Sequence, residues 1–139
     1  MTKMVAVSGG FDPIHVGHVR MIREAAKLGE YIVVIANSDE WLKRKKGYAF
    51  MTFEERAEIL SALEGVDSVI KADDTDNTVC ETLLKLKPDV FANGGDRKSG
   101  NIPEYDLCDN LNIKMVFGVG GNDKPQSSSW LVNKIRGKK

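Results

Sequence analysis

Strand-like apolar runs alternate with helix-like segments along this 139-residue chain. The clearest run, Tyr31–Ala36, is continuous and rich in β-branched residues, which suits a parallel strand buried on both faces. The predicted strands are 4–7, 31–36, 66–70, 89–93 and 113–119. The predicted helices are 19–28, 53–63, 78–86 and 104–111, with a last one that opens at 126–129 and runs through 135. This alternation predicts an α/β fold: a doubly wound parallel sheet of about five strands in three layers, with residues 1–139 as a single domain.

The charge balance excludes several kinds of partner. Lysine and arginine together number 20, and so do aspartate and glutamate, which makes the formal net charge zero. A protein that coats nucleic acid needs a surplus of cations, so we expect no nucleic-acid partner. No apolar run approaches the ~20 residues of a membrane span, and the N-terminus lacks the apolar core of a signal peptide. We therefore expect a cytoplasmic protein without a membrane partner, in which Cys80 and Cys108 are reduced, buried thiols.

A glycine pair, Gly9-Gly10, lies where the first strand passes into the first helix, and two histidines follow it. Glycine lets a backbone approach a phosphate closely, and a helix N-terminus supplies unpaired N–H donors with a partial positive charge. His15 and His18 are three residues apart, so both can face one ligand from one side of a helix. Neither the G-x-x-x-x-G-K-[ST] nor the G-x-G-x-x-G phosphate signature is present. We expect the two histidines to contact phosphate rather than to have a purely structural role. Metal binding is disfavoured because a third ligand at helical spacing is missing.

Three further clusters fall at the carboxyl edge of the predicted sheet, where ligands of such sheets bind. They are the basic run 43–46, the turn 94–97, and the loop 120–129 with its three consecutive serines. Each has a plainer explanation: the basic run could be a solvated surface turn, Asp96 could cap a turn, and the serines could serve only as an N-cap. Arg56 could form a surface ion pair or contact a ligand.

The stretch Gly10–His18, preceded by Gly9, resembles the G-x-F-D-x-x-H-x-G-H signature of the cytidylyltransferase-like nucleotidyltransferases. Later segments resemble that family in the same order: Asn37–Glu40 with the basic run, Glu54–Arg56, Gly94–Asp96 and Gln126–Ser129. The resemblance therefore covers essentially the whole chain. The chain is similar in part to glycerol-3-phosphate cytidylyltransferases and in part to heptose-phosphate adenylyltransferases, so we expect CTP as the nucleotide donor and keep ATP as the alternative.

The resemblance implies a Rossmann-like fold and a reaction in which a phosphate on an acceptor attacks the α-phosphorus of a nucleoside triphosphate. Pyrophosphate leaves, and a small phosphorylated alcohol, polyol or sugar receives the nucleoside monophosphate. A divalent ion, usually Mg²⁺, and a homodimer are also implied. No serine or cysteine lies beside an obvious base, in agreement with the family's lack of a covalent intermediate. Two alternatives are kept: an adenylyltransferase that makes an ADP-sugar or a nucleotide cofactor, and a regulatory protein that binds nucleotide without turnover.

The resemblance also implies roles for individual residues. The expected catalytic residues are His15, His18, Lys45 and Lys46. The expected nucleotide-binding residues are Gly9, Gly10, Phe11, Asp12, Gly17, Gly94, Gly95, Asp96, Gln126, Ser127, Ser128 and Ser129. Arg56 and Lys124 are expected to bind phosphate or the acceptor, and no residue is expected to ligate a metal. Lys124 stands where glycerol-3-phosphate cytidylyltransferases carry an arginine, and lysine lacks the bidentate fork of arginine.

Overall fold

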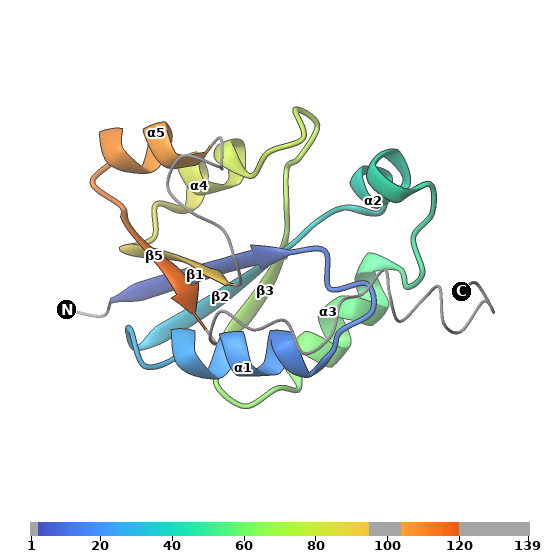
Figure 1. The fold of residues 1–139 in the computed structure, drawn as a ribbon, viewed down its shortest axis with the longest axis horizontal. Coiled ribbons are helices and arrows are strands. Elements are labelled where there is room, and N and C mark those ends of the chain that lie inside the picture. Colours follow the sequence, from blue (N-terminus) through green and yellow to red (C-terminus); the bar gives the residue numbers. More distant parts are fainter. Residues whose placement is uncertain (1–2, 95–103, 120–139) are drawn as a thin grey trace.

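A computed structural model describes residues 3–94 and 104–119 of the chain. It has five parallel strands in the order β3-β2-β1-β4-β5 (Figure 1). The strands are β1 Met4–Gly9, β2 Tyr31–Ala36, β3 Ser68–Lys71, β4 Val90–Gly94 and β5 Lys114–Val119. The helices are α1 Val16–Ala25, α2 Asp39–Lys46, α3 Phe53–Ser61, α4 Cys80–Leu86 and α5 Glu104–Asn110. The predicted parallel α/β sheet is confirmed, with each strand and helix expected inside the described residues.

The strand order reverses beside β1, the central strand. From β1 the chain adds β2 and then β3 on one side, with Met4 in register with Tyr31. It then crosses over to add β4 and β5 on the other side, where Val5 pairs with Val90. In open parallel sheets, a ligand binds at such a reversal, beyond the carboxyl ends of the strands. The site is therefore expected where β1 and β4 end.

Helices cover both faces of the sheet and enclose a core on each side. Helices α1 and α3 lie on one face, and α4 and α5 lie on the other (Figure 1). Because successive side chains of a strand point to opposite faces, Val5 and Val7 of β1 pack with Ile22 and Leu60, whereas Ala6 joins the core under α4 and α5. Each fully buried valine, leucine or isoleucine stabilises the fold by about 1.5–3 kcal/mol. The two cores thus fix the strand ends on which the site is built.

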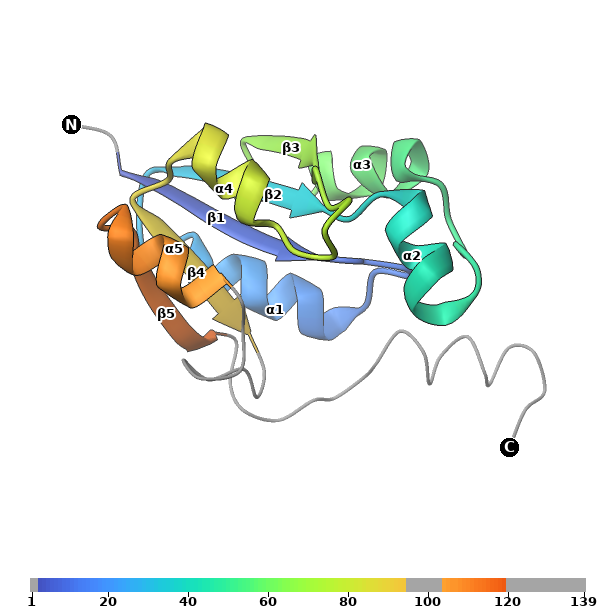
Figure 2. The ribbon, with the colours of Figure 1, turned by 90° about the horizontal axis from the view of Figure 1, so that it is seen from above.

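The basic run 43–46 is helical, which corrects the alternative of a surface turn. Ser38 caps α2 by accepting a hydrogen bond from Trp41 N–H, and Gly47 ends the helix in the left-handed conformation at φ 87°. Only Leu42 of this helix is buried, so the apolar periodicity that reveals most helices is absent from its sequence. Helix α2 lies beyond the carboxyl ends of β1 and β2 (Figure 2). Its basic residues thus stand at the edge where the site is expected.

The helix ends show two smaller points. Helix α1 begins at Val16 rather than at residue 19, because His15 caps it. The predicted cap of α3 is confirmed, since the Thr52 hydroxyl accepts a hydrogen bond from Glu55 N–H.

The helix expected from residue 126 onward lies outside the described residues. In the part of the chain that is described, no helix is long and apolar enough to cross a membrane.

The two cysteines are free thiols, and the prediction that both are buried is correct for Cys108 but wrong for Cys80. Cys108 is buried between the helices and the sheet, and this desolvation raises the pKa of its thiol to about 11. Burial also raises the pKa of Cys80, which is only partly covered. Thiols with raised pKa values hold little reactive thiolate at neutral pH. A structural role is therefore favoured for both.

Candidate active site

The turn after β1 is close-packed, and its two glycines are required by that packing. Phe11 folds back over Gly9, so that a Cβ on Gly9 would lie 3.2 Å from the Phe11 ring. A Cβ on Gly10 would lie 3.1 Å from a methyl group of Leu42 in α2. Phe11 is 1% exposed and has a positive φ of 53°, a strained conformation for a residue other than glycine. Contacts with α2 and with the core therefore hold this turn in its shape.

His15 and His18 together cap the N-terminus of α1. The His15 ring accepts a hydrogen bond at Nδ1 from Gly17 N–H (3.1 Å), and the His18 ring accepts one at Nδ1 from His15 N–H (3.2 Å). This is a capping box in which both side chains are imidazoles. The two rings stack with centroids 3.9 Å apart, and Phe11 packs edge-on to His18 at 4.7 Å. Since Nδ1 accepts a hydrogen bond in each ring, the ring proton is on Nε2, which makes Nε2 the donor toward a ligand.

His18 is held in its neutral form. Burial is the main cause that lowers the pKa of His18 to about 3, and the neighbouring His15 lowers that pKa as well. The imidazole therefore carries no charge at neutral pH, and it offers a hydrogen bond rather than a full positive charge. The structure brings the two rings together on one side of α1, as their spacing predicts.

We expect His18 to make the folded protein less stable as the pH falls below about 6.5, the usual pKa of histidine. The folded state keeps His18 neutral down to about pH 3, whereas the unfolded chain takes up a proton near pH 6.5. Protons therefore favour unfolding between these values, and the effect is absent above them. In His18→Gln, whose amide can still accept the His15 N–H bond, urea unfolding should show a smaller loss of stability between about pH 7.5 and about pH 4.5. Equal losses in the two proteins would contradict a buried neutral His18.

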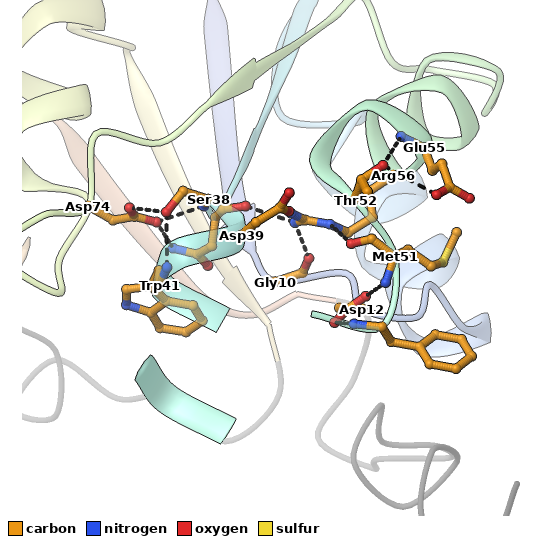
Figure 3. A network of polar contacts seen from close by, with 12 residues as sticks. Gly10, Asp12, Ser38, Asp39, Trp41, Met51, Thr52, Glu55, Arg56 and Asp74 are labelled. Atoms are coloured by element: carbon orange, nitrogen blue, oxygen red, sulfur yellow. Dashed lines mark hydrogen bonds and ion pairs between the residues drawn. The ribbon is translucent and has the colours of Figure 1, made fainter. Parts of the chain in front are cut away.

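Asp12 joins the glycine turn to the segment that follows α2. Its carboxylate is 1% exposed and accepts hydrogen bonds from Phe50 N–H (2.7 Å) and Met51 N–H (2.6 Å) (Figure 3). Lys46, at the end of α2, places Nζ 2.7 Å from the Asp12 carbonyl oxygen and 3.1 Å from its carboxylate. Asp12, expected to bind nucleotide, thus turns its carboxylate toward the protein. Lys46, expected among the catalytic cations, has its ammonium against Asp12.

Arg56 is fully buried in the same region (Figure 3). Its guanidinium donates to the carbonyl oxygens of Gly10 and Asn37 (both 2.8 Å) and of Met51 (3.1 Å). It also donates to Asp39 Oδ1 at 2.7 Å, in an ion pair. One side chain thereby ties the turn after β1 to the end of β2, the first turn of α2 and the segment before α3. Arg56 forms a buried ion pair rather than a surface one, and this position does not support its expected contact with phosphate or the acceptor.

Asp74 is a buried carboxylate that the sequence does not single out. It follows β3, is 3% exposed, and accepts hydrogen bonds from Ser38 N–H (2.8 Å), Ser38 Oγ (2.6 Å) and Asn37 Nδ2 (3.0 Å) (Figure 3). A carboxylate removed from water needs such donors, because an unpaired buried charge is very costly. In the sequence, Asp74 lies in the acidic loop 72–77, whose carboxylates look alike. Only the fold shows which of them is buried.

The four basic residues of α2 differ in what they contact. Arg44 and Lys46 donate hydrogen bonds to the loops on either side of the helix. Lys43 and Lys45 are exposed, and Nζ of Lys45 lies 4.7 Å from the centre of the Trp41 ring, in a cation–π contact. Lys43 and Lys45 are therefore the cations of this helix best placed for a ligand to reach.

The described residues do not form a metal site of their own. Within 3–94 and 104–119, no three or more histidine, cysteine, aspartate or glutamate side chains are placed to hold an ion. The carboxylates of Asp12, Asp39 and Asp74 accept hydrogen bonds from protein donors. Mg²⁺ is usually held by one or two carboxylates together with substrate phosphates and water. This donor set does not fit a resident Mg²⁺, so an ion that arrives on a nucleotide is treated as part of the substrate.

The other residues expected at the site fall into two groups. Gly17 lies in the first turn of α1, and Gly94 ends β4 beside the switch point. Gly95, Asp96, Lys124, Gln126, Ser127, Ser128 and Ser129 lie outside the described residues. The structure thus brings together the histidine turn and the basic helix. That the clusters 94–97 and 120–129 join them stays a prediction.

Comparison with known proteins agrees with this geometry. Residues 6–118 match the Cytidylyltransferase-like family. The bifunctional protein HldE of Wolinella succinogenes is 34% identical over 137 residues, which are 97% of this chain and 27% of HldE. The FAD synthase of Ferroglobus placidus is 42% identical over 95 residues, which are 68% of this chain and 60% of the synthase. This chain thus spans about a quarter of the length of HldE and 60% of that of the synthase.

Solved structures share the fold. The lipopolysaccharide core biosynthesis protein from Thermoplasma volcanium GSS1 superposes with a TM-score of 0.74 at 26% identity, over 88% of this chain and 100% of that one. A protein with unknown function from Archaeoglobus fulgidus superposes with a TM-score of 0.62 at 18% identity, over 90% of this chain and 96% of that one. The second likeness shows the fold alone. The shared topology extends over most of the chain.

Proposed function

Because this chain belongs to the cytidylyltransferase-like family of nucleotidyltransferases, we propose that it transfers a nucleoside monophosphate from a nucleoside triphosphate to a small phosphorylated acceptor. The acceptor is a phosphorylated alcohol, polyol or sugar, and pyrophosphate is released. The observation that carries the proposal is the histidine-capped glycine turn beside the strand switch point. Two Nε2 donors and the N-terminus of α1 suit an anionic phosphate at the place where open parallel sheets bind ligands.

The proposed chemistry takes place at one phosphorus atom. An oxygen of the acceptor phosphate attacks the α-phosphorus and forms a new P–O–P bridge. The bond from that phosphorus to the leaving pyrophosphate breaks, and its electron pair leaves with the pyrophosphate. His15 and His18 donate through Nε2 to the phosphate oxygens on which negative charge builds. Such donors lower the barrier because they are already oriented before the reaction begins.

Cations complete the proposed site. Lys45 neutralises the acceptor phosphate or the α-phosphate, because it is exposed on α2, and Lys43 assists it. Lys46 and Arg56 hold the segments of the site in place rather than contact the substrate, since Lys46 is paired with Asp12 and Arg56 with Asp39. The roles implied for the remaining residues are kept: nucleoside contact by Gly94, Gly95 and Asp96, triphosphate contact by Gln126, Ser127, Ser128 and Ser129, and acceptor contact by Lys124. Mg²⁺ enters with the triphosphate as part of that substrate.

We favour ATP over CTP as the donor. FAD, the product named for the FAD synthase relative, contains an adenosine monophosphate unit, and that relative is 42% identical over 95 residues. This supports the alternative in which the product is a nucleotide cofactor or an ADP-sugar. The homodimer implied by the family resemblance stays a prediction.

The proposal is tested by measuring pyrophosphate release from ATP or CTP in the presence of Mg²⁺ and a panel of acceptors. The panel contains glycerol 3-phosphate, several sugar 1-phosphates and flavin mononucleotide, and mass spectrometry identifies the product. We expect release that depends on one acceptor, is faster with ATP, and is accompanied by the condensed product. Triphosphate binding without release from any pair would contradict the proposal and favour the regulatory alternative.

A further inference from the structure

The N-terminus of α2 rests on the buried Asp74 carboxylate. Asp74 Oδ2 accepts hydrogen bonds from Ser38 N–H and Asn37 Nδ2, and Oδ1 accepts one from the Ser38 hydroxyl (Figure 3). The same Ser38 oxygen accepts Trp41 N–H at 3.1 Å and so caps the helix. The capping bond and the buried carboxylate are thereby linked through one hydroxyl group. A carboxylate near a helix N-terminus also interacts favourably with the helix dipole.

The loop that carries Asp74 holds α2 at a second point. Arg44, in the last turn of the helix, donates from Nη2 to the Asp74 carbonyl oxygen (2.8 Å) and from Nε to Asn77 Oδ1 (3.1 Å). Its guanidinium fork spans this short loop and engages it twice. The loop after β3 therefore contacts both the start and the last turn of the helix.

The opposite side of α2 packs on the glycine turn. The place of a Cβ on Gly10 lies 3.1 Å from the Leu42 side chain and 3.9 Å from the Trp41 ring. At the end of the helix, Lys46 is bonded to Asp12. Helix α2 is thus clamped between the loop after β3 and the turn that carries the two histidines. Any movement of the clamp changes where its exposed lysines stand.

We propose that Asp74 is a positioning residue for the acceptor, because it fixes the start of α2 through Ser38 and so sets the position of Lys43 and Lys45, the exposed lysines of the helix that packs on the glycine turn. The inference rests on the proposed function and takes, of its two assignments for Lys45, the one to the acceptor phosphate rather than to the α-phosphate. Asp74 itself is buried and touches no substrate. The contacts of Asp74 lie on the β2–β3 side of the sheet, whereas the histidines follow β1. Loss of Asp74 should therefore weaken use of the acceptor more than binding of the triphosphate.

The test compares Asp74→Asn with Asp73→Asn, a matched control from the same loop. Asp73 is 43% exposed and forms a surface ion pair with Lys85, so its neutralisation leaves the clamp intact. In Asp74→Asn, the negative charge is lost, and an amide nitrogen replaces one of the two oxygens that accept hydrogen bonds from Asn37 and Ser38. We expect the KM for the acceptor found in the panel to rise on the order of tenfold, the scale of one lost charge-assisted hydrogen bond. The KM for the triphosphate should stay close to that of wild type. If Asp74 served only to stabilise the fold, Asp74→Asn would instead lower the amount of active protein and leave both KM values unchanged.

A second measurement does not depend on turnover. In a Trp130→Phe background, Trp41 is the single tryptophan, since the chain has two, and quenching of its fluorescence by acrylamide reports the packing of α2. We expect stronger quenching in Asp74→Asn than in Asp73→Asn. If no acceptor supports turnover by wild type, the proposed function fails. Stronger quenching in Asp74→Asn would still show that Asp74 holds α2 in place.

A variant of the helix residue that contacts the same loop guards against misfolding. Arg44→Lys keeps the positive charge but loses the fork that bonds Asp74 and Asn77, so it should raise the acceptor KM and the quenching in the same direction. The inference would be overturned if Asp74→Asn and Arg44→Lys both showed the same acceptor KM and the same quenching as Asp73→Asn. Equal rises in the KM values of acceptor and triphosphate would also overturn it.

Discussion

Replacing His15 or His18 with alanine should lower the rate of pyrophosphate release by ~10²- to 10³-fold, the usual cost of removing one preorganised donor to a transition state. Each imidazole has Nδ1 bonded to a backbone N–H of the α1 cap, which leaves Nε2 as the donor. Alanine removes that donor and leaves the developing charge without its partner. The rate is measured as acceptor-dependent pyrophosphate release at saturating triphosphate.

The histidines also cap a helix, so the control must separate capping from catalysis. Alanine at an N-cap costs about 0.5–2 kcal/mol of stability, whereas asparagine is among the best N-cap residues. His15→Asn should therefore unfold like wild type but lose the rate as His15→Ala does. His18→Gln, which can complete the capping box, serves in the same way at the second position. A near wild-type rate in these two variants would show that the rings serve only the helix cap. The double alanine variant should lose less than the product of the two single losses if the rings act as a unit.

Replacing Arg56 with methionine should lower the free energy of unfolding by about 3–5 kcal/mol, because it removes one partner of a buried ion pair. Three backbone carbonyl oxygens and the Asp39 carboxylate lose their donor at once. The Asp39 side chain is 26% exposed, so water replaces part of the lost bonding and the lower end of this range, about 3 kcal/mol, is expected. Against a typical total of about 5–15 kcal/mol, this is a large share.

Urea unfolding measures this loss as a lower midpoint with an unchanged m value. The control is Arg23→Met, an exposed arginine on α1, which should change stability by less than about 0.5 kcal/mol. Asp39→Asn combined with Arg56→Met should cost less than the sum of the single changes, because the two residues share one interaction. If Arg56→Met and Arg23→Met unfold at the same urea concentration, the buried guanidinium is not what holds these segments together.

Much of the fold is predictable because its signals are local. The β-branched run 31–36 is buried on both faces from residue 32 onward and marks β2 directly, and Thr52 marks the start of α3. The spacing of His15 and His18 is enough to place both rings on one side of a helix. Helix α2 is the exception, since a helix with a single buried residue carries no apolar periodicity.

The polar framework of the site is not predictable in the same way. Arg56 bonds residues that lie between 5 and 46 positions away in the sequence, and Asp74 bonds residues 36 and 37 positions away. Nothing local separates a buried charge from a solvated one, because burial is decided by which loops meet at the carboxyl edge of the sheet. The same holds for the basic run, where only the fold separates Lys46, bound to Asp12, from the exposed Lys45.

The histidine turn should support direct transfer to the acceptor phosphate, and an oxygen-labelling measurement tests this most directly. The acceptor carries ¹⁸O in its phosphate, and the products are weighed by mass spectrometry with wild type and with the His15→Ala, His18→Ala double variant. Direct attack predicts that wild type forms the condensed product with all of the label and releases unlabelled pyrophosphate, while the double variant forms almost none. Label in the pyrophosphate, hydrolysis of the triphosphate without a condensed product, or undiminished product from the double variant would contradict the claim.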